Sequence, residues 1–288
     1  MGRVFQFMRP TISVVMPTRG RGTFVSRAIS TVLKQTYEEF ELLIVDNSPP
    51  PDRECILEMS KSDPRIRFVD RGNIGVTDAR RLGALLSRGR LLALLDSDDY
   101  WDRERLEKHV QVWKDNRIGL SWDRWAEVSG REATEFPQPF SEGPISGRKV
   151  AVQLHKGNFI HASAGIVLAS FAKDFGFPVR NVMSSDWMLF MRAAEFYPVY
   201  FVGDTLSFKE LESPDRVSDT GTQEFFSTEG RIIRRWALIH NPRVYARQYL
   251  NTRLSRVLQG ARNRDRGHLA RRPGGRLSLV VAKKRRTN

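Results

Sequence analysis

The sequence predicts an α/β fold with a doubly wound, mostly parallel sheet flanked by helices. Short apolar runs alternate with segments whose apolar residues recur at helical spacing. Residues 91–95 are five consecutive residues without a polar side chain, which is typical of a strand covered on both faces. Asp96, Asp98 and Asp99 follow at once. They would lie beyond the carboxyl end of that strand, where open α/β sheets bind ligands.

The first half of the chain reads as alternating strands and helices. The expected strands are 12–16, 40–45, 66–69, 91–95 and 118–122, and the expected helices are 24–35, 52–61, 76–87 and 102–114. The second half is less regular. It is expected to hold a loop at 129–147, a helix at 148–155, a strand at 158–168, a helix from Ser184, and short strands at 199–202 and 205–208.

The formal net charge of +14 is concentrated at the end of the chain. Residues 231–288 hold 17 Lys or Arg residues and one acid, Asp265. Basic amphipathic helices at 222–240 and 242–259 and a disordered tail are expected here, and such helices can lie on anionic membrane surfaces. Nucleic acid is a less favoured partner, because aromatic residues do not alternate regularly with the Lys and Arg residues of this segment.

Cysteine content and hydropathy predict a cytoplasmic protein, free or peripheral on the inner face of a membrane. Cys55 is the single cysteine, so no intrachain disulfide can form. No stretch approaches the roughly 20 apolar residues that span a bilayer. The first residues lack the pattern of a signal peptide.

Three candidate site features each have a structural alternative. The clustered Asp96, Asp98 and Asp99 would be relieved of mutual repulsion by a divalent cation, but an acid here can also cap the next helix. Asp46 ends the second strand, where an acid can bind a nucleoside or simply form a turn. Arg80 lies in the first turns of a helix, where anions bind, or on a solvated charged face.

Five motifs in order resemble the family 2 inverting glycosyltransferases, over residues 11 to about 216. They are ISVVMPTRGR at 12–21, LLIVDN at 42–47, GNIGVTDARRLG at 72–83, LLALLDSDDYW at 91–101 and SDWMLFMR at 185–192. The resemblance implies the Rossmann-like GT-A fold, with a nucleotide-sugar-binding half at 1–125 and an acceptor and catalytic-base half at 126–220. The basic helical C-terminal extension at 221–288, expected from charge and periodicity, would follow this domain.

The resemblance also implies roles for single residues. Asp186 would be the general base, Trp187 would bind the acceptor, and Asp98 would ligate a divalent cation, Mn2+ or Mg2+. The nucleotide-sugar would be bound by Pro17, Thr18, Arg21, Asp46, Asn73, Gly75, Arg80, Asp96 and Ser97. Asp46 would contact the base, and Asp96 the ribose or the metal.

The implied reaction is metal-dependent transfer of a sugar, with inversion, from a nucleotide-diphosphate donor to a hydroxyl acceptor. A UDP-sugar donor and a saccharide or lipid-linked acceptor are expected, in the synthesis of a cell-surface polysaccharide or glycan. Asn47, Arg81, Ser185 and Met188 depart from the family pattern. Ser185 and Met188 leave open a catalytically silent nucleotide-sugar binder, and the basic tail leaves open a nucleic-acid-binding protein.

Overall fold

The computed structural model describes residues 10–20, 22–49, 52–72, 74–115, 117–177 and 184–213. They all belong to one compact unit, Met1–Arg234. Arg21, Asn73 and the predicted extension at 221–288 lie outside the described residues, so the expectations for them stay predictions.

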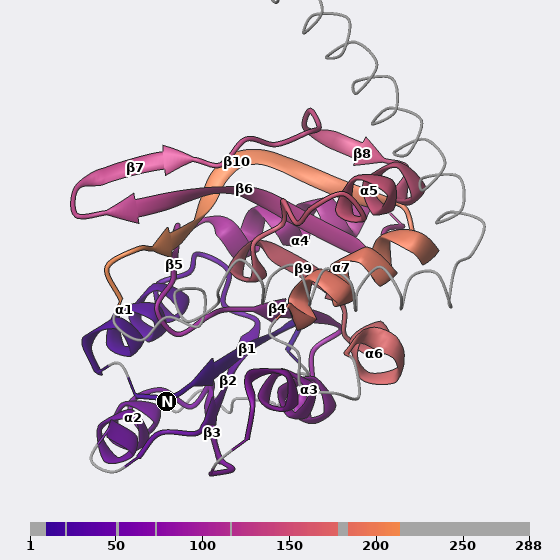
Figure 1. Ribbon diagram of the computed structural model, residues 1–288. Helices are drawn as coiled ribbons and strands as arrows, with labels where there is room; N and C mark the ends of the chain where they lie inside the picture. Colours follow the sequence, from indigo (N-terminus) through magenta and orange to yellow (C-terminus); the bar gives the residue numbers. More distant parts are fainter. Residues whose placement is uncertain are drawn as a thin grey trace, which may run out of the picture. The chain divides into compact units, whose positions relative to one another are not determined.

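The first half of the chain alternates strands and helices as predicted (Figure 1). Its elements are β1 (Ile12–Thr18), α1 (Gly22–Leu33), β2 (Phe40–Asp46), α2 (Asp52–Ser60), β3 (Ile66–Asp70), α3 (Val76–Leu86), β4 (Leu91–Leu94), β5 (Tyr100–Trp101) and α4 (Arg105–Asp115). Strands β3, β2, β1 and β4 are neighbours in that order and run parallel. The predicted α/β fold with a mostly parallel sheet is therefore confirmed for this half.

The second half continues the same sheet instead of forming one of its own. Its elements are β6 (Leu120–Ser129), β7 (Glu132–Glu135), β8 (Gly143–Ile145), α5 (Gly147–Leu154), the short turn η1 (Ala162–Ala164), β9 (Gly165–Leu168), α6 (Ala169–Phe171), the π-turn η2 (Ala172–Gly176), α7 (Ser185–Phe196) and β10 (Val199–Glu210). Strand β9 is antiparallel to both β4 and β6, and so joins the two halves. The predicted domain boundary at residue 125 falls within β6, and the division into halves stays a prediction.

Two expectations for the second half are wrong. The predicted loop at 129–147 contains β7 and β8, which pair with β6 and β10 at the sheet edge. All four residues of β7 are exposed, so no buried apolar face marks this strand in the sequence. The predicted strand at 158–168 is a strand only over β9, because the residues before it form a turn in which the His161 side chain accepts a hydrogen bond from the Ser163 N–H.

Two further boundaries differ from the expectation. The short strands at 199–202 and 205–208 are one strand, β10, whose pairing with β6 shifts register between Val202 and Ser207. The helix expected from residue 102 begins at Arg105, because the Asp102 carboxylate accepts a 2.8 Å bond from the Glu104 N–H and forms a turn.

The central strands are buried on both faces, as the apolar runs predict. Every residue of β1, β2 and β4 is buried. Alternate residues of these strands join a hydrophobic core with α1, α2 and α4. On the opposite face α3 lies against β1, where a Cβ added to Gly83 would come within 2.2 Å of Val15 Cγ1. The close approach of α3 to β1 fixes the position of the helix that carries Arg80.

A buried charged cluster connects α4 to β6. Arg105 Nε donates to Asp123 at 2.8 Å, and His109 Nε2 lies 3.0 Å from the same carboxylate oxygen. All three side chains are 0% exposed. The Arg105 guanidinium also stacks 4.2 Å from the ring of Trp101. This ion pair anchors the turn that follows the acidic residues.

Candidate active site

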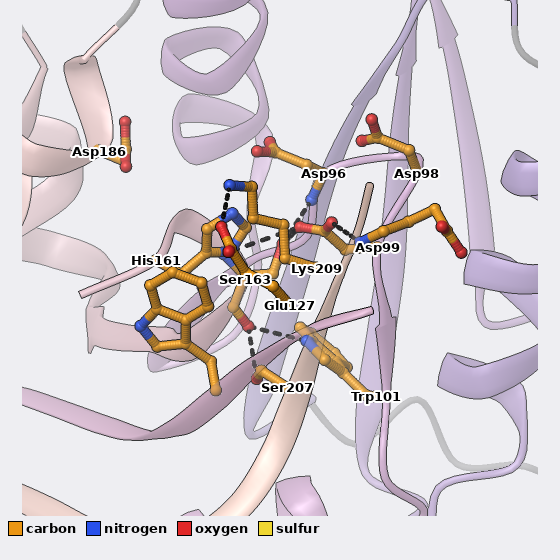
Figure 2. A network of polar contacts seen from close by, with 12 residues as sticks. Asp96, Asp98, Asp99, Trp101, Glu127, His161, Ser163, Asp186, Ser207 and Lys209 are labelled. Carbon is orange, nitrogen blue, oxygen red and sulfur yellow. Dashed lines mark hydrogen bonds and ion pairs between the residues drawn. The ribbon is translucent and has the colours of Figure 1, made fainter. Parts of the chain in front are cut away.

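The acidic turn Asp96–Asp99 lies at the carboxyl end of β4 and is tied to η1 (Figure 2). The Asp96 N–H donates to Ser163 Oγ at 3.0 Å, and the Ser163 hydroxyl donates to Asp99 at 2.5 Å. The backbone N–H of Glu210, at the end of β10, donates to the other Asp99 oxygen at 3.3 Å. Asp99 thus connects the acidic turn to η1 and to the end of β10.

Two further hydrogen bonds hold the backbone carbonyl of Ser163. Its carbonyl oxygen accepts a 2.8 Å bond from Trp101 Nε1 and a 3.1 Å bond from the Ser207 hydroxyl, and Figure 2 shows Ser163 between Ser207 and the turn. Ser207 in turn accepts a 3.0 Å bond from Arg105 Nε. The acidic turn is therefore connected through Ser163 to the buried charged cluster.

Asp96, Asp99 and His161 form a group of potential metal ligands. One ligand atom from each lies within 4.8 Å of the others. Two carboxylate oxygens and an imidazole nitrogen suit a divalent ion such as Mn2+. Asp98, the predicted ligand, is not a member of this group, which is the one found among the described residues. The assignment of the metal ligand to Asp98 stays a prediction.

Electrostatics around this group disfavour charge on its buried members. Burial raises the pKa of Asp99 well above its usual value, and Asp98 and Asp96 raise it further. Burial lowers the pKa of His161 to about 4, so its imidazole is neutral at pH 7. Lys209, which pairs with Glu127 at 2.8 Å, adds to this lowering. A bound cation would favour the ionised carboxylate and the neutral imidazole.

Arg80 joins the two predicted functional carboxylates. Its Nη2 donates to Asp96 Oδ1 at 2.8 Å, and its Nη1 donates to Asp186 Oδ1 and to Ser185 Oγ, both at 3.1 Å. Burial by itself lowers the pKa of Arg80, but Asp96 and Asp186 outweigh it and raise the pKa. Arg80 is charged in this setting, and a solvated charged face, the alternative for this residue, is wrong because its side chain is only 4% exposed.

Asp186 lies in the first turn of α7, which Figure 2 places across from Asp96. Burial raises the pKa of Asp186, while Arg80 opposes this rise and Asp96 adds to it. A carboxylate with a raised pKa is a stronger proton acceptor than a solvated one. Trp187 follows in the chain, and its indole N–H donates to the Leu154 carbonyl at 2.8 Å. That bond holds α7 to α5; the acceptor-binding role of Trp187 stays a prediction.

A second group of predicted residues lies at the ends of β1 and β2. Thr18 pairs in register with Asp46, and both are buried. One Asp46 oxygen accepts a 2.5 Å bond from Ser48, and the other lies 3.4 Å from Arg53 Nε. Pro17 pairs with Val45 one step earlier in the same register. Polar side chains are thus gathered where two parallel strands end.

The remaining described candidates lie at the same edge of the sheet. Gly75 is the N-cap of α3, with an extended backbone. Ser97, in the acidic turn, is buried. Gly75 follows β3 and Ser97 follows β4, and their roles in donor binding stay predictions.

Sequence reasoning left several residues of this region without a role. Ser163 and Glu210 come from distant elements and carry no motif around them. Arg53 contacts Asp46 and also Asp70, at 3.1 Å, but reads in the sequence as one more charge on a helix. His161 has no neighbouring histidine, cysteine or acid in the sequence that would indicate a metal site. The only local indication is Ser163, two residues later, whose N–H donates to the His161 side chain.

A sequence model described as glycosyl transferase family 2 matches residues 13–175, which include all of β1 but its first residue, the acidic turn, Arg80 and Ser163. This chain belongs to glycosyl transferase family 2. The five motifs that suggested the resemblance thus led to the right family. Asp186 lies outside the matched residues, so its assignment as the base stays a prediction from the motif.

Curated relatives of this family 2 chain include glycosyltransferases of bacteria. An uncharacterized glycosyltransferase of Rickettsia bellii is 29% identical over 47% of this chain and 19% of its own. Another, of Nostoc sp., is 25% identical over 87% of this chain and 78% of its own. The UDP-Glc:alpha-D-GlcNAc-diphosphoundecaprenol beta-1,3-glucosyltransferase WfgD of Escherichia coli is 33% identical over 41% of this chain and 47% of its own. The chain thus spans about a fifth of the Rickettsia relative.

Solved structures confirm the GT-A fold of this family 2 chain. Residues 1–349 of TarS of S. aureus, in complex with UDP-GlcNAc, superpose with a TM-score of 0.65, at 17% identity over 79% of this chain and 66% of TarS 1–349. The mannosyltransferase PcManGT from Pyrobaculum calidifontis, in complex with GDP-Man and Mn2+, has a TM-score of 0.53 at 15% identity, over 87% and 81%. Within the described ranges, no helix is both long and apolar enough to cross a membrane.

Proposed function

We propose that this chain is a metal-dependent inverting glycosyltransferase. It moves a sugar from a nucleotide-diphosphate donor to a hydroxyl acceptor in the synthesis of a cell-surface polysaccharide or glycan. The observation that carries the proposal is that Arg80 contacts both Asp96, in the acidic turn, and Asp186, the predicted base. The shared guanidinium thus brings a donor-binding carboxylate close to a proton acceptor, and a transfer between two substrates requires that proximity.

The donor would lie over the carboxyl ends of β1, β2 and β4. Asp46, with its neighbours Thr18 and Ser48, would contact the nucleoside. TarS binds UDP-GlcNAc and PcManGT binds GDP-Man, so the fold accepts both bases, and a UDP-sugar is our first choice. WfgD acts on a diphosphoundecaprenol-linked sugar, which supports a lipid-linked acceptor.

A divalent cation would be held by oxygen and nitrogen atoms of Asp96, Asp99 and His161, with Asp98 as the alternative ligand from the motif. When bound, the cation supplies positive charge that offsets the charge developing on the leaving diphosphate. PcManGT carries Mn2+, which supports Mn2+ as the cation here. Neutral His161 has one nitrogen lone pair, which accepts the Ser163 N–H, so a cation bound by His161 would take the place of that hydrogen bond.

Asp186 would accept the proton of the acceptor hydroxyl. The acceptor oxygen then forms a bond to the anomeric carbon of the donor sugar from the face opposite the diphosphate. The bond between that carbon and the diphosphate oxygen breaks, and the nucleoside diphosphate leaves with the electron pair, which inverts the configuration. Arg80 holds the Asp186 carboxylate in place, and Ser185 shares this contact.

The proposal is tested first by calorimetric titration of UDP, GDP, dTDP and CDP into the full chain, each with MnCl2 or with EDTA. Binding that is selective for one base and lost in EDTA is expected. Asp46→Asn should weaken it, and Asp204→Asn should not, because Asp204 pairs with Lys108 on the surface. Absence of binding by all four nucleotides would overturn the donor site.

Turnover separates an enzyme from a silent nucleotide-sugar binder. Ser185 replaces an acid of the motif, but its hydroxyl accepts a hydrogen bond from Arg80 and so still contributes to the site, which favours an active enzyme. Release of nucleoside diphosphate from UDP-glucose, UDP-GlcNAc and GDP-mannose should occur with the wild type and fall with Asp186→Asn. No release by either protein on donors that bind would favour the silent binder. Equal release by both proteins would contradict Asp186 as the base.

The location of the protein is a separate part of the proposal. Residues 231–288 would hold the enzyme on an anionic membrane surface, where a lipid-linked acceptor is found. Flotation with phosphatidylglycerol-containing liposomes should recover the full chain but not a chain ending at residue 230. Equal recovery of the two would contradict membrane binding by this segment.

A further inference from the structure

We propose that Arg80 is the positioning residue of Asp186 and that, through Arg80, cation binding at Asp96 depends on the charge of Asp186. The inference rests on the proposed function, since it concerns the same cation and the same base. It adds a coupling between the donor side and the acceptor side of the site.

The geometry divides one positive charge between two carboxylates. Nη2 of Arg80 lies 2.8 Å from Asp96 and Nη1 lies 3.1 Å from Asp186, so each carboxylate has a guanidinium nitrogen of its own. The two carboxylates compete for a single charge. Ser185 is neutral and accepts from Nη1 at 3.1 Å, so it aligns the guanidinium without adding a third negative charge.

The surroundings leave little freedom for Arg80 to move away. Its side chain is 4% exposed, and the side chain of Asp186 is 12% exposed. Helix α3 cannot approach β1 further, because Gly83 already packs against Val15. A change at one carboxylate is therefore passed to the other through the guanidinium and its electrostatic field, with no shift of the helix.

A cation bound at Asp96 offsets the negative charge that attracts Arg80 from this side. The guanidinium then interacts mainly with Asp186 and fixes the base for the acceptor. Because coupling between two sites is reciprocal, removing the negative charge of Asp186 should weaken cation binding at Asp96. Arg80 would then pair with Asp96 alone and oppose the cation there. A lysine could not replace it, since one ammonium lacks the planar fork that reaches both carboxylates.

The test is a double-mutant cycle with Mn2+ as the probe. The Kd for Mn2+ is measured by electron paramagnetic resonance, with and without UDP, for the wild type, Asp186→Asn, Arg80→Gln and the double variant. Asp186→Asn should weaken Mn2+ binding by about 2- to 150-fold, the range of coupling between residues that share one salt-bridge network. In the Arg80→Gln background the same substitution should change the Kd little.

A control separates this coupling from the general field of the protein. Asp78→Asn, on the same helix, removes the same charge, but Asp78 pairs with Arg81 and not with Arg80. It should leave the Kd for Mn2+ unchanged. Thermal melts of all variants report whether they fold. If Arg80→Gln does not fold, Arg80→Lys serves as the background, and there the effect of Asp186→Asn should fall by at least half.

The outcomes are distinguishable. An equal effect of Asp186→Asn in both backgrounds, or none in the wild type, would overturn the role of Arg80 while the proposed function stands. No binding of Mn2+ to the wild type, with or without UDP, would overturn metal dependence and this inference together. A reduced effect in the Arg80 variant, with Asp78→Asn unchanged, is the result that the shared guanidinium requires.

Discussion

The hydroxyl of Ser163 donates a hydrogen bond of 2.5 Å to the carboxylate of Asp99. The same hydroxyl oxygen accepts from the Asp96 N–H, so one buried side chain fixes both ends of the acidic turn. Sugar transfer would require the metal-binding carboxylates to be held in place before the donor arrives, and Ser163 provides this restraint.

We expect Ser163→Ala to weaken Mn2+ binding about 10- to 100-fold, because outer residues that orient metal ligands have effects of this size. It also leaves the Asp96 N–H without its acceptor, which costs about 1–3 kcal/mol of unfolding free energy. Mn2+ titration and urea unfolding measure the two effects. Ser87→Ala is the matched control, because the Ser87 hydroxyl donates to the Ala84 carbonyl and, among the described residues, to no group of the acidic turn. Equal Kd values for Ser163→Ala and the wild type would contradict the role of Ser163.

The pH dependence of turnover should report Asp186. The base must be deprotonated, and burial raises the pKa of this carboxyl above its usual value. Activity at saturating Mn2+ is therefore lost as the pH falls through that raised pKa and is fully present above it. The pH profile of kcat/KM measures the acid limb. Arg80 lowers the pKa of Asp186, so Arg80→Gln should move the limb to higher pH, and a limb that stays in place would contradict this pairing.

Asp186→Asn should reduce kcat by about 10²- to 10⁴-fold, the usual contribution of a positioned general base. The change keeps the shape of the side chain, so the fold should be retained. Single-turnover measurements at saturating donor separate this loss from weaker Mn2+ binding. A kcat close to that of the wild type would exclude Asp186 as the base.

Gly83→Ala should destabilise the fold by about 1–3 kcal/mol, since a methyl group would be forced against Val15. If α3 is displaced, Arg80 moves with it, so turnover should fall as well. Gly157→Ala is the control, because a Cβ at Gly157 meets nothing within 4 Å. Urea unfolding compares the two variants, and equal stabilities would contradict the close packing of α3 on β1.

Asp123→Ala should cost about 3–5 kcal/mol, because Arg105 would remain as a buried charge without its carboxylate. Asp204→Ala removes a surface partner of Lys108 and should cost only about 0–1 kcal/mol. Urea unfolding measures both. Similar losses for the two variants would show that the buried pair does not anchor this side of the site.

The sequence by itself determined the alternating half of the fold and the family. Two-sided burial of parallel strands produces continuous apolar runs, such as residues 91–95, and these are visible without a structure. The acidic turn and Asp46 each lie at the end of such a strand, and Asp186 lies in the first turn of a helix with apolar positions, so local patterns locate all three. The exposed strand β7 and the irregular β10 have no such pattern, and sequence reasoning misplaced or divided them.

Only the tertiary structure decided which of these residues meet. Arg80 contacts Asp96 and Asp186 because α3 and α7 both approach the carboxyl end of β4, and no spacing in the chain encodes that approach. Ser163 lies beneath the acidic turn because β9 pairs antiparallel between β4 and β6. Side-chain contacts between distant segments depend on how the sheet is ordered and how closely helices pack on it. Local propensity and periodicity carry no information on either.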